Sequence, residues 1–507
     1  MKRTLHLFLL CCLLPLGVFG QPGSFDPDFG TNGRVAANIG AGISDMVLQP
    51  DGKIVASGGY GVNVDTSFMI VRYLEDGTLD AEFGDNGRVI TQIGDSAAIN
   101  SIALQPDGKI VAAGSSSIII NGVTTIDVAV ARYNTDGSLD TTFNTTGFLT
   151  IPLEGTSNAN VVKIQQDGKI LLAGIRDSQF SIIRLFEDGT IDESFNMNGY
   201  PHANTNRRKE ITAMELLPDG SILASGRINN TMNVVKYTST GLPDESFGNA
   251  GWVSLAHISG ITYMPGIVVL ENGDIIIAGG IMPSTKYIGI LVKLSANGSL
   301  VESFGENGIL YNDVGANLSC QAREVAVSRG KLIVGYSSGL TSNYDFNVSA
   351  YDMNGVPDIT FADNGSNIFT FGGLGHEYLC AIVIQPDDKI LVGGTGPVMM
   401  GFRMARLMPV DAVADTESFD KTVNRFMVYP NPVTANSVLM LDIKNSGPVT
   451  LQLYDVKGTL ISTIAQSKFF AAGKTEVPLQ LPQLEKGVYF LNIREADKQS
   501  NVVKIVN

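Results

Sequence analysis

Residues 77–89 read GTLDAEFGDNGRV, and residues 102–114 read IALQPDGKIVAAG. Variants of these two stretches alternate seven times between residues 25 and 408, at a spacing of about 55 residues. The first stretch holds a Phe followed four residues later by a Gly, in the pairs Phe29 and Gly33, Phe83 and Gly87, Phe143 and Gly147, Phe195 and Gly199, Phe247 and Gly251, Phe304 and Gly308, and Phe361 and Gly365. The second holds a turn glycine, which recurs as Gly52, Gly108, Gly168, Gly220, Gly273 and Gly330, with Asp388 in the seventh copy. A tandem repeat of this length predicts a fold built from repeated structural units.

The repeated turn predicts a β-hairpin in each unit. A short hairpin loop commonly contains one residue at positive φ, which glycine adopts without steric penalty. Asp388 replaces this glycine in the last copy, and Asp tolerates positive φ better than most residues do. The flanking segments are short, rich in β-branched residues and without helical periodicity, so we expect three or four antiparallel strands per unit. In the first unit these segments are residues 43–49, 53–59, 67–74 and 87–93.

Seven such units predict an all-β fold, a seven-bladed β-propeller over residues 21–408. The chain enters the repeats on residues 28–35, which match the end of a unit, and leaves them on residues 402–408, which match a third strand without a successor. The N-terminal strand is therefore expected to complete the last blade and to close the ring. The alternative is an open β-solenoid, which would need capping repeats with polar outer faces that we do not find in the sequence.

A family resemblance supports this interpretation. Residues 77–89, 102–114 and 130–140 (VARYNTDGSLD) resemble the delta-60 repeat family of bacterial proteins. The resemblance covers residues 25–408 and is strongest in the first two units. It implies a propeller-like fold and secretion or surface exposure, and it implies no reaction.

The N-terminus has the pattern of a secretory signal peptide over residues 1–20. Lys2 and Arg3 precede an apolar run, residues 7–19, that is too short to span a membrane, and small residues precede a cleavage point before Gln21. The alternative is a lipoprotein cleaved before Cys11, which the preceding Leu10 disfavours. No transmembrane helix is expected after removal of the signal.

The C-terminus is predicted to form a separate β-sandwich over residues 426–507, after a polar linker at 409–425. Its matching segments are YPNP (429–432), LYDVKG (453–458), KGVYFLNI (486–493) and the closing KIVN (504–507). Together they resemble the type A sorting domain of the type IX secretion system of Bacteroidota. The resemblance implies that residues 426–507 engage this machinery and that the tail is removed or exchanged for a surface anchor. An ordinary accessory sandwich is the alternative.

Composition narrows the range of partners. The chain has 507 residues, a formal net charge of −15 and 17% charged residues, which argues against nucleic acid and anionic membrane surfaces as partners. Cys320 and Cys380 remain after signal removal, and the sequence leaves open whether they form a disulfide or stay as buried thiols.

No catalytic, cofactor-binding or metal-binding residues are predicted. The histidines beyond the signal, His202, His257 and His376, fall in different units, whereas a metal site needs clustered ligands. Acidic turns such as residues 73–80 and 133–140 faintly resemble calcium loops. Asp in such turns more often hydrogen-bonds its own backbone, so a structural calcium ion is the less favoured interpretation.

Charged residues recur at one further position. The third strand carries a cation in six units, as Arg72, Arg132, Arg184, Lys236, Lys293 and Arg406, with Ala350 in the other. We expect each cation to pair with a repeated Asp or to lie along the blade surface. That Asp occurs as Asp26, Asp80, Asp140, Asp192, Asp244 and Asp358, with Val301 in the other unit. A ring of cations could instead mark an anion site.

The predicted inner strands carry isolated charges. Lys163 and Glu215 occupy equivalent positions in adjacent units and are expected to form a neutralised ion pair and not an acid–base couple. Asp45, Arg323 and Glu324 are the other inner-strand charges to which a catalytic interpretation would turn.

The connections that vary between units are expected to gather on one face of the ring, where loops on a rigid scaffold commonly bind ligands. They include residues 59–67, 115–127, 200–210 and 256–266, and their aromatic candidates for ligand contact are Tyr60, Tyr200, Tyr263 and Tyr344. The sequence therefore predicts a non-catalytic, secreted or surface-attached binding propeller for a polysaccharide or a protein. The alternatives are an extracellular polysaccharide hydrolase or lyase at the channel mouth and a structural surface-layer component.

Overall fold

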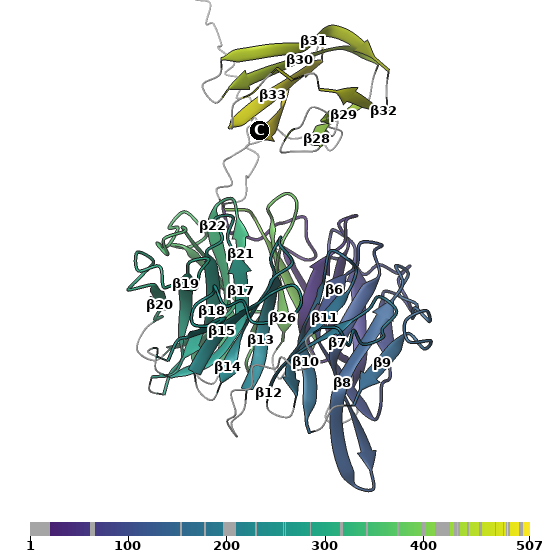
Figure 1. The fold of residues 1–507 in the computed structure, drawn as a ribbon, viewed down its shortest axis with the longest axis vertical. Coiled ribbons are helices and arrows are strands. Elements are labelled where there is room, and N and C mark those ends of the chain that lie inside the picture. Colours follow the sequence, from purple (N-terminus) through teal and green to yellow (C-terminus); the bar gives the residue numbers. More distant parts are fainter. Residues whose placement is uncertain are drawn as a thin grey trace, which may run out of the picture. The chain divides into compact units, whose positions relative to one another are not determined.

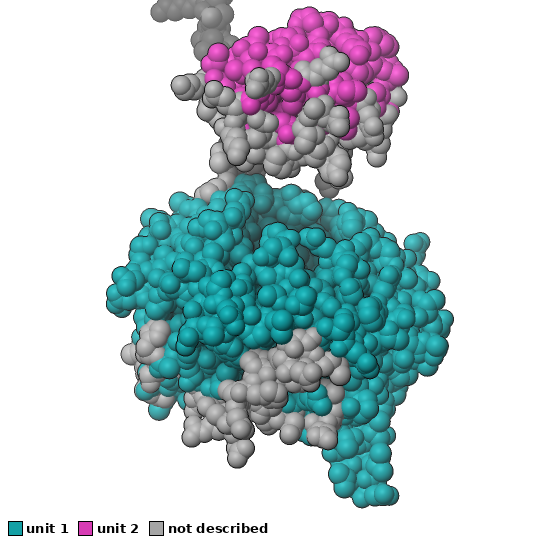
Figure 2. All heavy atoms as spheres, in the orientation of Figure 1, with its two compact units in different colours: residues 1–414 teal, residues 415–507 magenta. Residues whose placement is uncertain are grey.

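The computed structural model of the protein contains two compact units, residues 1–414 and residues 415–507, coloured separately in Figure 2. The structure describes residues 21–410 and 426–506, except for 61–65, 153–154, 177–178, 196–208, 229–230, 257, 259, 284, 315–317, 341–342, 373–374, 397–400, 430–432, 434–436, 444–445, 456–458, 472, 480, 483, 485–486 and 496–499. The predicted signal peptide and residues 411–425 of the predicted linker lie outside these ranges.

The described secondary structure of the first unit is all β, in short antiparallel sheets (Figure 1). One sheet consists of β2 (Ile43–Leu48), β3 (Ile54–Tyr60), β4 (Ser67–Tyr73) and β5 (Arg88–Thr91), paired in chain order. The second consists of β6 (Ser96–Leu104), β7 (Ile110–Ile120), β8 (Val123–Tyr133) and β9 (Phe148–Ile151). The hairpin of β7 and β8 extends well beyond the neighbouring strands in Figure 1.

The following sheets repeat this order. The third consists of β10 (Ser157–Ile164), β11 (Ile170–Arg176) and β12 (Gln179–Leu185). The fourth consists of β13 (Lys209–Leu216), β14 (Ile222–Ile228), β15 (Thr231–Tyr237) and β16 (Trp252–Ser254). The fifth consists of β17 (Ile261–Val269), β18 (Ile275–Ile281), β19 (Ile288–Leu294) and β20 (Ile309–Asn312). The sixth consists of β21 (Leu318–Ser328), β22 (Lys331–Leu340), β23 (Asn343–Tyr351) and β24 (Ser366–Phe369).

The last sheet joins the two ends of the repeats. It contains β25 (Tyr378–Ile384), β26 (Ile390–Thr395), β27 (Phe402–Leu407) and, at its outer edge, β1 (Arg34–Ala37). Strand β1 pairs antiparallel with β27, from Arg34 opposite Ala405 to Ala37 opposite Phe402. The N-terminal strand thus completes the sheet that the last repeat leaves one strand short.

The sheets of the first unit surround an axis. The first strand of each sheet contacts the first strand of the next, from β2 through β6, β10, β13, β17 and β21 to β25, and β25 contacts β2 again. Sheets arranged radially in a closed ring form a β-propeller, so the predicted fold class is confirmed. An open solenoid would lack the contact between β25 and β2.

The repeated turn lies between the first two strands of each sheet. Gly52 takes a φ of 84°, and Asp388, which replaces the glycine in the last sheet, takes a φ of 65°. The turn of the sixth sheet is tighter, because Ser328 pairs directly with Lys331 across Arg329 and Gly330. Between the equivalent pairs Leu48–Ile54 and Val327–Leu332 lie five residues in the first sheet and four in the sixth. Positions in β21 are therefore displaced by one residue relative to those in β2 when they are counted from the turn.

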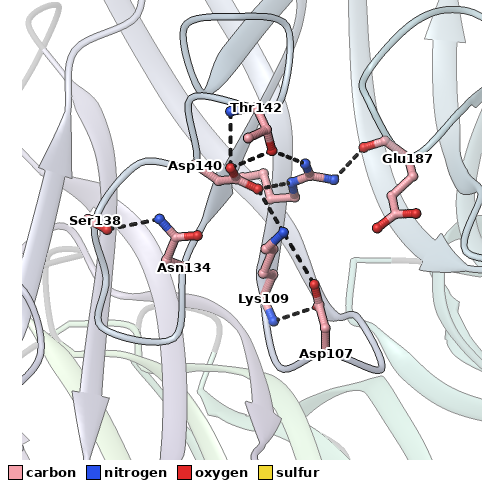
Figure 3. A network of polar contacts seen from close by, with 8 residues as sticks. Asp107, Lys109, Asn134, Ser138, Asp140, Thr142 and Glu187 are labelled. Carbon is pink, nitrogen blue, oxygen red and sulfur yellow. Dashed lines mark hydrogen bonds and ion pairs between the residues drawn. The ribbon is translucent and has the colours of Figure 1, made fainter.

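Neighbouring blades are joined by repeated side chains that lie on the third strand of each blade and in the segment after it. Figure 3 shows this contact for the second blade. Arg132 Nε lies 2.7 Å from Asp140 Oδ2, and the turn residue Lys109 places its Nζ 3.1 Å from the same oxygen. Arg132 Nη1 also donates to the backbone carbonyl of Glu187, which belongs to the third blade. One arginine thus pairs with an acid of its own blade and hydrogen-bonds the next blade.

The repeated Phe completes the contact. Phe143 is fully buried, and the Arg132 guanidinium carbon lies 4.9 Å from the centre of its ring. Its ring packs on Gly189 in the third blade, where an added Cβ would come within 2.9 Å of the ring and where φ is 90°. We call Phe143, Arg132, Asp140 and their equivalents in the other blades the blade clamp. It explains why the Phe, the cation and the Asp recur together, and why a glycine such as Gly189 follows the third strand.

The blade clamp recurs around the ring, and the expected pairing of cation and Asp is observed in five blades. These pairs are Arg72 with Asp80, Arg132 with Asp140, Arg184 with Asp192, Lys236 with Asp244, and Arg406 with Asp26. The two exceptional blades find other partners. Where Val301 replaces the Asp, Lys293 lies 3.2 Å from Asp274; where Ala350 replaces the cation, Asp358 lies 3.2 Å from the turn residue Lys331.

The second unit is a β-sandwich. Strands β28 (Phe426–Tyr429), β29 (Val438–Ile443) and β32 (Gly473–Pro478) form one sheet. Strands β31 (Leu460–Phe470), β30 (Gly447–Asp455), β33 (Val488–Glu495) and β34 (Ser500–Val506) form the other. Leu439 from the first sheet and Leu451 and Leu491 from the second are fully buried in one core.

We predict that Phe143→Ala destabilises the propeller by about 3–5 kcal/mol, because it removes a fully buried ring that joins two blades. Urea unfolding of the full chain, followed by circular dichroism, measures this. Ile359→Ala, at a side chain that is 72% exposed, is the control and should change the free energy of unfolding by less than about 0.5 kcal/mol. Equal effects of both substitutions would refute the role given to the blade clamp.

We also predict that acid weakens the blade clamp. Burial by itself raises the pKa of Asp140, but hydrogen bonds from Thr142 and Lys109 and the charge of Arg132 outweigh it and hold the pKa well below its usual range. A carboxyl with a lowered folded-state pKa stabilises the fold fully above its unfolded pKa of about 3.9, and this contribution is lost as the pH falls through the folded value.

Asp140→Asn should therefore be markedly less stable than the wild type at pH 7, and the gap should narrow between about pH 4 and pH 2. Thermal unfolding across this pH range measures the gap. The control Glu193→Gln, at an exposed carboxyl, should stay close to the wild type throughout. A gap for Asp140→Asn that does not change with pH would contradict the assignment.

Candidate binding site at the channel mouth

A β-bulge interrupts the first strand of each blade at nearly the same level. In six of these strands the pairing register skips a single residue, and these residues are Ser44, Asn100, Asn160, Thr212, Arg323 and Cys380. Strand β17 has two irregularities, on either side of Tyr263. Bulges are common next to functional sites because they redirect a side chain out of the regular ladder. Here all six skipped residues line one cavity of about 370 Å³ at the end of the ring where the first strands begin.

We call this cavity the channel mouth. It lies on the face that carries the variable connections between blades, since the first strands start there and the regular turns lie at their other ends. Asn100 Nδ2 donates to the carbonyl of Ala159 at 2.8 Å, and Asn160 Nδ2 donates to that of Ile211 at 2.7 Å. Each amide therefore links one first strand to the next and holds the mouth open at a fixed width.

Below the mouth, the channel forms a cavity of about 500 Å³ that gathers four charged side chains, Asp45, Lys163, Glu215 and Glu324. Lys163 Nζ lies 2.8 Å from Glu215 Oε2, and the two side chains are 36% and 32% exposed. Burial lowers the pKa of Lys163, but the charge of Glu215 and their hydrogen bond outweigh it and raise the pKa. The predicted ion pair between adjacent blades is confirmed.

Asp45 and Glu324 occupy equivalent positions, each directly after the bulge of its strand. Asp45 Oδ2 accepts hydrogen bonds from Ser101 Oγ and from the backbone N–H of Ile102, both at 2.9 Å. Glu324 Oε1 accepts one from the backbone N–H of Val325 at 3.1 Å. Burial raises the pKa of both carboxyls, that of Glu324 to about 8, and the charge of Asp45 adds to the rise at Glu324.

A third cavity, of about 510 Å³, adjoins the mouth on the side of the fifth, sixth and seventh blades. We call it the aromatic cleft, and Tyr287, Tyr344, His376, Tyr378 and Arg323 line it. The rings lie close together: the centre of Tyr344 lies 4.7 Å from that of His376 and 5.9 Å from that of Tyr378. His376 and Tyr378 are stacked at 5.5 Å. Arg323, Cys380 and Thr395 line both the cleft and the mouth, so the two cavities are continuous.

Backbone contacts fix the rings of the cleft in place. The N–H of Glu377, between His376 and Tyr378, donates to the carbonyl of Tyr344 at 2.8 Å. The carboxylate of Glu377, which is 1% exposed, accepts the N–H of Phe371 on both oxygens at 3.0 Å. Tyr287 donates its backbone N–H to Ser319 Oγ, and its carbonyl accepts the N–H of Cys320. The aromatic cleft is therefore largely preformed.

The structure brings some of the residues singled out in the sequence into the cavities, and others lie outside the described residues. Tyr344 lies in the aromatic cleft, and Asp45, Lys163, Glu215 and Glu324 lie in the channel. Tyr200, His202 and His257 lie outside the described residues, as do the side chains of Tyr60 and Tyr263. Arg323 lies at the mouth and in the cleft. Sequence reasoning missed Tyr287, Tyr378 and the bulge residues Ser44, Asn100, Asn160 and Thr212. Polar residues recurring eight positions before the turn glycine, as at Ser44, Asn100 and Asn160, were the available signal for the bulge residues.

Two further expectations concern metals and cysteines. No three His, Cys, Asp or Glu side chains within the described ranges are grouped so that they could hold a metal ion. In the turns that faintly resemble calcium loops, Asp76 Oδ1 and Asp136 Oδ1 each accept the N–H of the residue two positions later, at 2.9 Å. Cys320 and Cys380 are free thiols, and burial raises the pKa of both.

Comparison with known families agrees with this architecture. A model described as a domain of unknown function (DUF5122) β-propeller matches residues 49–83, 105–143 and 165–195. A model for a secretion system C-terminal sorting domain matches residues 427–507. The chain carries DUF5122 β-propeller repeats and a type IX secretion sorting domain. A model for the WD domain G-beta repeat also matches residues 87–120.

Solved structures similar to this chain show low sequence identity. A protein from Lactobacillus plantarum is 12% identical, with 84% of this chain and 99% of that chain covered and a TM-score of 0.40. Sqt1 from Chaetomium thermophilum is 8% identical over 74% of this chain and 99% of that chain, with a TM-score of 0.36. The Nup133 β-propeller domain of Vanderwaltozyma polyspora is 9% identical over 71% and 99%, also with a TM-score of 0.36. Comparison with curated proteins finds no match.

The sorting domain indicates export of the protein to the cell surface or the extracellular space. It also implies that the chain interacts with the secretion machinery. Across the described ranges, the structure contains no helix with the length and apolar character needed to cross a membrane.

We predict that Glu324→Gln changes how stability depends on pH. Between the unfolded pKa of a Glu, about 4.3, and the folded value of about 8, folded Glu324 keeps a proton that the unfolded chain has released. The wild type should therefore lose stability relative to Glu324→Gln as the pH rises from 5 to 8.

Chemical unfolding of both proteins at pH 5, 6, 7 and 8 measures this difference. Glu82→Gln, at an exposed carboxyl on the outer side of the first blade, is the control and should run parallel to the wild type. If the stability of Glu324→Gln changes with pH in the same way as that of the wild type, Glu324 does not titrate between pH 5 and pH 8.

Proposed function

We propose that the protein is a non-catalytic binding module of the cell surface, and that its propeller holds a polysaccharide chain in the aromatic cleft beside the channel mouth. The observation that carries the proposal is the cleft itself, a single cavity lined by three tyrosines and His376, of which Tyr287 and Tyr378 are half-buried and Tyr344 is 5% exposed. Ligand sites are typically concave, lined by aromatic side chains and supplied with a few polar groups. Tyrosine rings offer a flat apolar face for a sugar ring and a hydroxyl that can hydrogen-bond it.

The position of the cleft supports access by a large ligand. It opens on the face of the variable connections, where the first strands begin. The last described strand of the ring, β27, ends at Leu407 on the opposite face, beside the regular turns. The chain therefore leaves the propeller away from the cleft, and export to the cell surface or extracellular space brings the cleft into contact with extracellular polymers.

The charged groups of the channel favour a binding role over catalysis. The carboxylate of Asp45 is occupied by the backbone and hydroxyl donors of its own and the neighbouring blade, and Glu215 is paired with Lys163. A glycosidase needs one carboxyl to donate a proton and a second to act on the sugar or on water. The hydrolase or lyase alternative would have to use Glu324 with a partner already engaged in these contacts. Binding by the cleft needs no cofactor or metal.

We predict that Tyr378→Ala weakens polysaccharide binding by at least about tenfold, since the ring supplies a central wall of the cleft. Titration calorimetry with a panel of soluble polysaccharides measures affinity, and chromatography of the same mixtures detects products. Tyr311→Ala, at a 40% exposed tyrosine on the outer strand β20, is the matched control and should bind like the wild type.

The results separate the alternatives. Saturable binding that depends on Tyr378 and leaves the polymers intact supports the proposal. Released oligosaccharides would replace it by the enzymatic alternative, and the absence of binding to every polymer would reject it in favour of a protein ligand or a surface-layer role.

A further inference from the structure

We infer that the aromatic cleft selects acidic polysaccharides, and that Arg323 binds the carboxylate of a uronic acid residue whose ring lies against the tyrosines. This inference rests on the proposed binding function and names its ligand class. It follows from the placement of one arginine relative to the aromatic rings, from its uniqueness among the bulge residues, and from the distribution of charge around it.

Arg323 is oriented toward the cleft by the backbone. It is the skipped residue of the bulge in β21, between Ala322 and Glu324, so its side chain leaves the regular ladder and lines both the cleft and the mouth. Its guanidinium carbon lies 5.1 Å from the centre of the Tyr378 ring. A guanidinium held against an aromatic face keeps its planar donors in a fixed orientation, and planar paired donors match the two oxygens of a carboxylate.

Arg323 differs from the residues at the same structural position in the other blades. The other bulge residues that line the mouth are Ser44, Asn100, Asn160, Thr212 and Cys380, which are neutral. The cationic side chain therefore stands at the bulge that adjoins the aromatic rings. Among the described residues that line the cleft, Arg323 is also the one Lys, Arg, Asp or Glu. The cleft thus combines stacking surfaces with a single fixed cation.

The charge of the surroundings restricts where an acidic polymer can lie. The whole chain carries a formal net charge of −15, so it does not attract polyanions by its overall field. The channel beyond the mouth holds Asp45, Glu215 and Glu324 with one lysine. Even with Glu324 protonated, as its raised pKa of about 8 implies near neutral pH, the acids exceed the lysine by one negative charge, which opposes entry of a uronate. An acidic chain is therefore kept in the cleft, where recognition depends on the local contact with Arg323 and the rings.

The test uses three uronate polymers, polygalacturonate, alginate and hyaluronan, each paired with its carboxyl-reduced neutral form. Titration calorimetry on the secreted full chain, with EDTA present to prevent gelling by calcium, gives the affinity ratio within each pair. We expect at least one uronate polymer to bind at least about tenfold more tightly than its reduced form, as one charge-assisted contact would give.

Variants locate the origin of this ratio. Arg323→Gln should bring the ratio close to one, and Arg323→Lys should restore only part of it because lysine lacks the paired donors. Tyr378→Ala should weaken binding of both forms. Arg88→Gln on the outer strand β5 removes one positive charge outside the cleft and should keep the wild-type ratio.

The outcomes distinguish the inference from the function on which it rests. If the neutral forms bind as tightly as the uronates and this binding needs Tyr378, the inference is wrong and the cleft still binds sugar. Uronate binding that survives both Tyr378→Ala and Arg323→Gln would place the contact elsewhere and overturn the inference. If no polymer of either kind binds, the proposed function itself fails.

Discussion

The pairing of a cation on the third strand with an Asp that follows this strand, together with the Phe beside it, is the interaction on which the rest of the propeller depends. Arg132 shows why, since it binds Asp140 within its blade and the Glu187 carbonyl of the next. Phe143 packs against Gly189 of that next blade, where a larger side chain would not fit. The buried ring and the hydrogen bond thereby fix this blade to its neighbour, and the ion pair within the blade holds the arginine in place.

The two blades that break the pattern show what the constraint requires. Where Val301 stands in place of the acid, Lys293 pairs with Asp274 in the turn of the same blade. Where Ala350 stands in place of the cation, Asp358 pairs with Lys331, again from the turn. The charged side chain on or after the third strand therefore needs an oppositely charged partner, because a buried unpaired charge is costly. In these two blades the turn supplies that partner, an acid in one and a lysine in the other.

Because these contacts lie away from the axis of the ring, the side chains near the axis can differ from blade to blade. The bulges at the mouth take different side chains in different blades, and the asparagines among them bridge neighbouring strands without disturbing the blade clamp. The aromatic cleft draws its rings from three consecutive blades, and the buried Glu377 fixes the segment that carries two of them. Rigid packing at the blade clamp, together with different polar side chains at the channel mouth, is the arrangement that a binding scaffold needs.

The sequence by itself determined the all-β repeat, its hairpin turns, the positive φ of Asp388 and the pairing of Lys163 with Glu215, because these depend on local conformation or on a fixed period along the chain. It did not reveal that Asp45 and Glu324 are equivalent, since the shorter turn at Arg329 and Gly330 displaces the alignment by one residue. It also did not reveal the aromatic cleft. Tyr287, Tyr344 and Tyr378 are far apart in the chain and obey no common period, so only the packing of consecutive blades and the bulge in β21 bring them to the cation at Arg323.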